Sequence, residues 1–160
     1  MISIRNITKS YDGQRVLNEI SLDVPAGQTV SLIGPSGCGK STLLRIVMGL
    51  ISPDAGIVDI NGQQLRADNV LELRRQMGYV VQNGGLFPHL TARENLTLLS
   101  SFLGWSAAEE TRRISRLAEL TSIPESLLDR RPERLSGGQA QRISLMRALM
   151  LDPAIILLDE

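Results

Sequence analysis

Cysteine, histidine and aromatic residues are scarce in this chain of 160 residues. The single cysteine, Cys38, excludes an internal disulfide and a zinc site built from cysteines. The single histidine, His89, removes most histidine-based catalysis. Net charge is absent as well, because 17 Lys and Arg residues balance 17 Asp and Glu residues. A general surface for nucleic acid or anionic membranes needs excess positive charge, so neither partner is expected.

Long apolar runs are missing too. No stretch approaches the roughly 18 apolar residues of a membrane span. The first residues lack the charged and then apolar pattern of a signal peptide, so we expect a cytosolic protein. What is present is an ordinary globular composition, with 42% hydrophobic residues and a length that suits one domain.

The last residues of the chain raise a question. Residues 154–158 are apolar and strand-like, and two carboxylates, Asp159 and Glu160, follow at once. A strand of this kind is normally buried in a parallel sheet. Natural domains seldom stop at the end of a central strand with no helix to follow. We therefore expect the chain to be a fragment.

Strands are predicted toward both ends of the chain. Alternating or continuous apolar runs indicate them at residues 2–9, 14–24, 28–33, 57–60, 78–82 and 154–158. The run at 28–33 reads as a buried strand. Asp12-Gly13 and Asn61-Gly62 are typical of hairpin turns.

Helices are predicted at 40–48 and 69–76, and helices and loops predominate from 84 to 135. Capping-box patterns begin three further helices, at Thr91, Ser106 and Ser136. The order of elements therefore predicts an α/β protein with a helical insertion between its two α/β parts.

A phosphate-binding loop lies between the predicted strand at 28–33 and the predicted helix at 40–48. Gly34-x-x-x-x-Gly39-Lys40-Ser41 matches the pattern completely. Its glycines let backbone N–H groups surround phosphate oxygens, and the helix N-terminus adds partial positive charge. Lys40 would reach the β- and γ-phosphates, and the Ser41 hydroxyl would bind Mg²⁺.

Two further motifs fit a nucleotide site. Asp159 follows a predicted buried strand, where it would help to hold Mg²⁺, and Glu160 would polarise an attacking water as general base. Leu135-Ser-Gly-Gly-Gln139 places a capping serine and two glycines at a helix N-terminus that is open to an anion.

Taken together, the chain resembles the nucleotide-binding subunit of an ATP-binding cassette (ABC) transporter. Residues 34–41 match the Walker A motif of that family, 135–139 its signature, and 155–160 its Walker B motif with the catalytic glutamate. Gln82 matches the Q-loop glutamine. Tyr11 matches the aromatic residue that stacks on adenine.

The resemblance implies a P-loop NTPase core with a mainly parallel sheet, an N-terminal antiparallel β subdomain and an inserted helical subdomain. The core with its β subdomain would comprise 1–83 and 140–160, and the helical signature subdomain 84–139. The family continues past Walker B to a switch histidine. His89 precedes the signature and does not match it, so the resemblance also implies a C-terminal truncation.

The resemblance further implies the site residues. The catalytic residues would be Glu160, Lys40 and Gln82, and the residues near Mg²⁺ would be Ser41, Gln82 and Asp159. ATP would contact Tyr11, Gly34, Pro35, Ser36, Gly37, Cys38, Gly39, Lys40, Ser41, Thr42 and, from the opposite subunit, Ser136, Gly137, Gly138 and Gln139.

The implied partners are a second nucleotide-binding subunit arranged head-to-tail, transmembrane permease subunits and, indirectly, a substrate-binding protein. The protein would lie on the inner face of the cell membrane and power transport by hydrolysing ATP. Residues 78–91 resemble bacterial importers, and 84–87 with the Gly104-Trp105 region resemble importers of osmoprotectants such as glycine betaine, carnitine or choline.

Two alternatives stay open at this point. One is a soluble ABC ATPase of DNA repair, chromosome condensation or translation. Against it stand the absence of heptads between Lys40 and Ser136, the single cysteine and the presence of less than one full cassette. The other is a truncated chain that binds nucleotide without turnover, because the strands that would flank 155–158 are missing.

Overall fold

The computed structural model describes residues 1–82 and 84–159. The chain forms two compact units, Met1–Arg74 and Arg75–Glu160. Among the described residues, no helix combines the length and the apolar character of a membrane-spanning segment. The core and helical subdomains expected from the sequence follow different boundaries from these two units, and that division stays a prediction.

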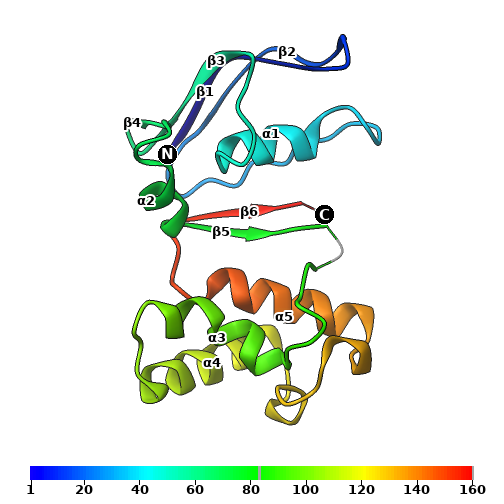
Figure 1. Ribbon diagram of the computed structural model, residues 1–160, viewed down its shortest axis with the longest axis vertical. Coiled ribbons are helices and arrows are strands. Elements are labelled where there is room, and N and C mark those ends of the chain that lie inside the picture. Colours follow the sequence, from blue (N-terminus) through cyan, green and yellow to red (C-terminus); the bar gives the residue numbers. More distant parts are fainter. Residues whose placement is uncertain (83, 160) are drawn as a thin grey trace. The chain divides into compact units, whose positions relative to one another are not determined.

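The first unit contains a four-stranded antiparallel sheet (Figure 1). Its strand order is β2-β1-β3-β4, so the first strand of the chain lies inside the sheet. The strands are β1 (Ile2–Tyr11), β2 (Gln14–Val24), β3 (Ala55–Ile60) and β4 (Gln63–Gln64). Ile2 stands opposite both Val24 and Ile60, which places its buried side chain between two neighbouring strands.

Two predicted hairpin turns of the first unit are confirmed. Asp12 and Gly13 have φ values of 48° and 79°, and Asn61 and Gly62 have values of 51° and 82°. Two consecutive residues with positive φ match the twist of the flanking strands, and Asn, Asp and Gly adopt that conformation at the lowest cost. The turn residues therefore set the pairing of β1 with β2 and of β3 with β4.

The predicted strand at 28–33 is wrong for this structure. Among the described residues, 28–33 pair with no strand, and the side chain of Ile33 is 95% exposed. Val30 is also exposed. An apolar run becomes a strand only when neighbouring strands accept its backbone hydrogen bonds, and nothing in the local pattern shows whether they are present.

The first unit also contains helices. They are α1 (Lys40–Val47) and α2 (Val70–Arg75), as predicted. Gly49, with φ of 65°, follows the end of α1. The guanidinium of Arg74 donates to the carbonyls of Met48 and Gly49 at 2.8 and 2.6 Å. These bonds satisfy carbonyls that the end of α1 leaves without a helical partner.

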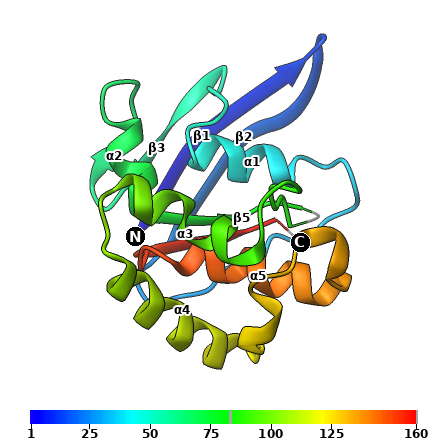
Figure 2. The same cartoon turned by 60° about the horizontal axis from the view of Figure 1, so that its bottom comes forward.

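The second unit begins and ends with the strands of a two-stranded parallel sheet, β5 (Met77–Val80) and β6 (Ile155–Leu158). Figure 2 shows the two strands side by side, above α5 (Gly137–Leu149). Gly78 lies so close to α5 that a Cβ there would collide with the carbonyl oxygen of Ala148. Glycine at this position lets β5 pack directly on the helix backbone.

Two more helices, α3 (Ala92–Phe102) and α4 (Ala107–Thr121), complete the second unit, together with the short turns Glu125–Leu127 and Pro132–Arg134. All three predicted capping boxes are confirmed. Thr91 with Glu94, Ser106 with Glu109 and Ser136 with Gln139 each exchange hydrogen bonds at a helix start. Each box satisfies backbone donors that the first turn leaves free.

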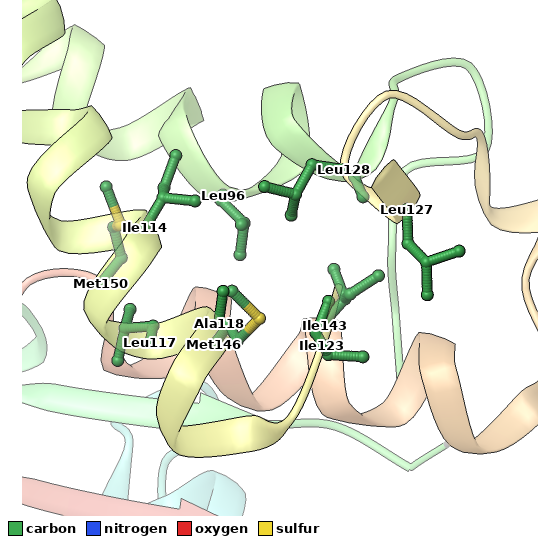
Figure 3. Packing of buried hydrophobic residues seen from close by; sticks show 11 residues of the cluster. Leu96, Ile114, Leu117, Ala118, Ile123, Leu127, Leu128, Ile143, Met146 and Met150 are labelled. Carbon is green, nitrogen blue, oxygen red and sulfur yellow. The ribbon is translucent and has the colours of Figure 1, made fainter. Parts of the chain in front are cut away.

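The buried core of the second unit lies among α3, α4 and α5 (Figure 3). Leu96 of α3, Leu117 of α4 and Met146 of α5 are each at most 2% exposed. Burying a side chain of this kind contributes about 1.5–3 kcal/mol. Because its side chains Ile143 and Met146 are part of this core, α5 is held firmly against α3 and α4.

Candidate functional site

The phosphate loop leads directly into α1. Gly39 is the N-cap of the helix, with φ of 97°. A Cβ on Gly39 would lie 2.7 Å from Cδ2 of Leu17 and 3.1 Å from the carbonyl oxygen of Val16. Glycine is therefore required here twice, for its backbone conformation and for the close approach of β2. The loop N–H groups and the positive end of α1 together form a site suited to phosphate.

Lys40 is the first residue of α1, and its ammonium group is tied to the loop. Nζ donates to the carbonyls of Gly34 and Pro35 at 2.9 and 3.0 Å, and it lies 3.9 Å from Sγ of Cys38. Carbonyl oxygens carry only partial charge, whereas phosphate oxygens carry full charge. A phosphate in this loop would therefore compete well for the same ammonium group. Ser41 and Thr42 follow in the first turn of α1.

Tyr11 ends β1 and is 42% exposed. The Nζ of Lys9 lies 5.5 Å from the ring centroid, and the same Nζ forms an ion pair with Asp54 at 2.8 Å. That ion pair, together with a bond from the Ser10 N–H, holds the pKa of Asp54 below its usual range. The ring is therefore partly accessible, and the neighbouring Lys9 side chain is fixed by its ion pair with Asp54. Its contact with adenine stays a prediction.

In the second unit, the carboxyl ends of β5 and β6 bring two predicted site residues to one edge. Asp159 follows β6 and is 4% exposed. Its N–H donates to the carbonyl of Val80 at 2.9 Å, so the residues after β5, including Gln82, begin at the same edge. In parallel α/β sheets, this is the edge where ligands bind. Glu160 lies outside the described residues.

Sequence reasoning missed the partner of Asp159. The hydroxyl of Tyr79, on β5, donates to Oδ2 of Asp159 at 3.0 Å. The two residues are 80 positions apart, and the parallel register that pairs Tyr79 with Leu157 brings them together. A buried carboxylate needs such donors. An aromatic hydroxyl on the strand before Gln82 was the only signal in the sequence.

The predicted signature residues lie at the start of α5. Ser136 is the N-cap, and its N–H donates to Oε1 of Gln139 at 2.9 Å while its hydroxyl accepts from the Gln139 N–H at 3.3 Å. Gly137 and Gly138 are exposed, and a Cβ on either would meet no atom within 4 Å. No steric demand of the described residues requires glycine here, although glycine weakens a helix by about 1 kcal/mol per residue.

The predicted site residues divide between the two units. Tyr11 and residues 34–42 belong to the first unit, and Gln82, residues 136–139 and Asp159 belong to the second. A model of the family described as "ABC transporter" matches residues 17–160. The chain belongs to the ABC transporter family.

Relatives of this ABC transporter chain with similar sequence identity are named for different transported substrates. It is 42% identical to the carnitine transport ATP-binding protein OpuCA of Listeria monocytogenes, over all of its length and 41% of that protein. It is 43% identical to the sulfate/thiosulfate import ATP-binding protein CysA of Pseudomonas syringae, over 99% of its length and 49% of that protein. The chain thus spans about half the length of these relatives or less.

A solved ABC structure has the same fold. The ATP-binding cassette MJ0796, in a dimeric post-hydrolysis state bound to ADP and Pi, superposes with a TM-score of 0.92 at 36% identity. The match covers all of this chain and 74% of that one. The fold class expected from the sequence, that of an ABC cassette, is therefore confirmed. The role of each site residue in this chain stays a prediction.

Proposed function

We propose that this chain is the ATP-binding and ATP-hydrolysing part of an ABC importer. The observation that carries the proposal is the phosphate loop at the start of α1, where Gly39 adopts its left-handed conformation and Lys40 is held over the loop carbonyls. The ADP and Pi in the MJ0796 structure support the proposal, because the structural match to that cassette covers the whole of this chain.

The loop residues Gly34, Pro35, Ser36, Gly37, Cys38, Gly39, Lys40, Ser41 and Thr42 would bind the phosphates of ATP through backbone N–H groups, hydroxyls and the Lys40 ammonium group. Tyr11 would stack on the adenine. An aromatic ring and a row of N–H donors are matched to the two ends of this ligand.

The donor set also fits Mg²⁺. Ser41, Gln82 and Asp159 offer a hydroxyl, an amide oxygen and a carboxylate, and hard oxygen ligands are those that Mg²⁺ prefers. Among the described residues, no group of three or more His, Cys, Asp or Glu forms a metal cage. When bound, Mg²⁺ would neutralise charge on the phosphates.

Hydrolysis would depend on Glu160 and Gln82. Glu160, next after Asp159 in the sequence, would accept a proton from the attacking water, and Gln82 would orient that water near the γ-phosphate. The hydroxyl of Tyr79 donates to Oδ2 of Asp159, the last described residue, at 3.0 Å. A positioned general base contributes about 10²–10⁴-fold to rate.

A second copy of this chain would complete the site. The exposed start of α5 offers a helix N-terminus, the Ser136 hydroxyl and two glycines with open space around them. These are the features that let a backbone approach the phosphate of a nucleotide bound to another subunit. Ser136, Gly137, Gly138 and Gln139 would therefore contact the γ-phosphate across a head-to-tail dimer, and closure would exclude water.

Coupling to transport requires partners outside this chain. We propose permease subunits in the membrane, with this chain on the inner face and a substrate-binding protein supplying cargo. For the cargo we propose osmoprotectants such as carnitine or glycine betaine, which the carnitine relative and the 84–87 region support. The sulfate relative is equally similar and makes sulfate the competing cargo.

The experiment that tests the ATPase is a comparison of Glu160→Gln with Lys40→Met in the whole protein. Glu160→Gln should bind ATP normally and hydrolyse it at least about 100-fold more slowly, because only the base is lost. Lys40→Met should lose ATP binding itself. Glu119→Gln, on the exposed side of α4, is the matched control and should hydrolyse normally. Near-normal turnover by Glu160→Gln would refute the general base.

Reconstitution decides between the transporter and the two alternatives. Co-purification of the whole protein with a membrane permease, and ATP-dependent uptake of labelled glycine betaine into vesicles, is the expected result. Uptake of sulfate instead would change the cargo. A protein that purifies without a permease would favour a soluble ABC ATPase. One that binds ATP without turnover under all conditions would favour a chain limited to nucleotide binding.

A further inference from the structure

The backbone of residues 84–87 is held by side chains from two helices, α3 and α5. From α3, the amide of Asn95, which is fully buried, accepts from the N–H of Phe87 at 2.7 Å and donates to the carbonyl of Phe87 at 3.1 Å. The same amide nitrogen lies within bonding distance of the Leu90 and Thr91 carbonyls. This arrangement ties the segment to the helical core.

The second hold comes from α5. The hydroxyl of Ser144, which is fully buried, donates to the carbonyl of Gly84. The guanidinium of Arg147 donates to the carbonyl of Gly85 at 2.9 Å and approaches that of Gly84 at 3.4 Å. It also lies 5.8 Å from the ring centroid of Phe87. We call these two side chains, Ser144 and Arg147, the carbonyl clamp.

Glycine makes the clamped turn possible. Gly84 and Gly85 have φ values of 77° and 55°, in the left-handed region that other residues enter at a cost. A Cβ on Gly85 would collide with the side chain of Val81. The turn therefore directs two consecutive carbonyls toward α5, and the planar guanidinium fork can reach both.

The hydrogen bonds of Arg147 to the described residues go to carbonyl oxygens, those of Gly84 and Gly85. Among the described residues it forms no ion pair, and burial lowers the pKa of its guanidinium. Desolvating a cation without a counter-charge is costly, so the carbonyl bonds and the Phe87 ring must compensate for it.

We propose that Ser144 and Arg147 are positioning residues that tie the Gln82 loop to the signature helix. This inference rests on the proposed function, in which Gln82 and Ser136 respond to the γ-phosphate. Ser136 begins α5, and the two clamp residues lie roughly 12 and 17 Å further along the same helix. Because the core holds α5 rigid, a shift of Ser136 toward phosphate moves the Gly84 and Gly85 carbonyls with it. Gln82, two residues before Gly84, follows.

The kinetic test replaces Arg147 in the whole protein. Arg147→Met keeps the apolar stem and removes both carbonyl bonds, so kcat should fall about 10- to 100-fold while KM for ATP changes little. Arg147→Lys should recover part of kcat, because one ammonium can serve one carbonyl. Arg113→Met is the matched control. It also removes two carbonyl bonds, to Leu149 and Met150, together with an ion pair to Asp152, but none of these bonds reaches residues 84–87, so kcat should hold.

A double-variant test shows whether Arg147 acts through Gln82. When Gln82→Ala is already present, adding Arg147→Met should lower kcat no further, because the positioned group is gone. Full additivity of the two losses would overturn the positioning role. So would a fall in kcat for Arg113→Met equal to that for Arg147→Met, since that would indicate a general loss of stability.

Hydrogen exchange tests the clamp independently of catalysis. In the nucleotide-free whole protein, Arg147→Met should speed amide exchange at residues 84–87 at least about tenfold, whereas Arg113→Met should leave it unchanged. Unchanged exchange in Arg147→Met would overturn the clamp. A wild-type protein without ATPase activity would overturn the proposed function instead, and the exchange result would still decide the clamp.

Discussion

The starts of α3 and α4 differ from the start of α5 in charge and not in geometry. All three helices begin with a hydroxyl residue and a capping box. In α3 and α4 the third helical residue is an acid, Glu94 or Glu109. Bonds from Thr91 and Ser106 to these carboxylates hold their pKa values below the usual range. In α5 the corresponding residue is the neutral Gln139, and the first turn carries no acid.

The start of α5 thus departs from the usual preference for an acidic residue in the first turn of a helix. A carboxylate in the first turn neutralises the positive end of a helix and stabilises it. The start of α5 keeps the cap and omits that charge, and it adds two glycines that no atom of the described residues crowds. In α3 and α4, the partial positive charge of the helix N-terminus is thus neutralised by a glutamate of the chain itself. The third is left available to an anion from elsewhere, as the proposed contact with γ-phosphate requires.

The largest expected effect comes from blocking the start of α5. Ser136→Arg would place a long side chain where a second subunit brings its nucleotide. ATP binding to the monomer should persist, and hydrolysis by the paired protein should fall at least about 100-fold, as for loss of a transition-state donor. Equilibrium binding of ATP and steady-state hydrolysis measure the two arms. Loss of binding in the monomer would show that Ser136 does not act across a dimer.

A smaller effect should follow from making α5 resemble α3 and α4. Gln139→Glu can retain the capping box and should keep or raise the melting temperature, because an acid suits a helix N-terminus. Hydrolysis should fall about tenfold, since the added carboxylate repels the phosphate. The loss should be greatest at low ionic strength. A variant as active as the wild type at all salt concentrations would break the proposed distinction between the helix starts.

The smallest effect is expected from the reverse exchange in α4. Glu109 has a pKa below its ordinary value of 4.5, so its bonds to Ser106 stabilise the protein above that pH and are lost as the pH falls through the lower, folded-state pKa. Glu109→Gln should remove this contribution to acid sensitivity and leave hydrolysis unchanged. Urea unfolding between pH 3 and 7 measures it. If the pH dependence of the unfolding free energy were the same in Glu109→Gln and the wild type, protonation of Glu109 would not be linked to stability.

Local sequence patterns predicted much of this fold because the responsible interactions span only a few residues. The turns at Asp12 and Asn61, the three capping boxes and the phosphate loop each depend on side chains within eight positions of one another. The family resemblance then implied the remaining site residues. Glu160, the expected base, lies outside the described residues, and its role stays a prediction.

Contacts between distant segments could not be read from those patterns. The sequence alone determined that a phosphate loop, a glycine-containing helix start and an acidic strand end occur in one chain. Only the tertiary structure decided that residues 28–33 pair with no described strand, that Tyr79 holds Asp159, and that Arg147 grips the Gly85 carbonyl. The two hydrogen-bonded pairs lie 80 and 62 residues apart and meet only when helices and strands pack. Burial then selects which polar groups must find one another.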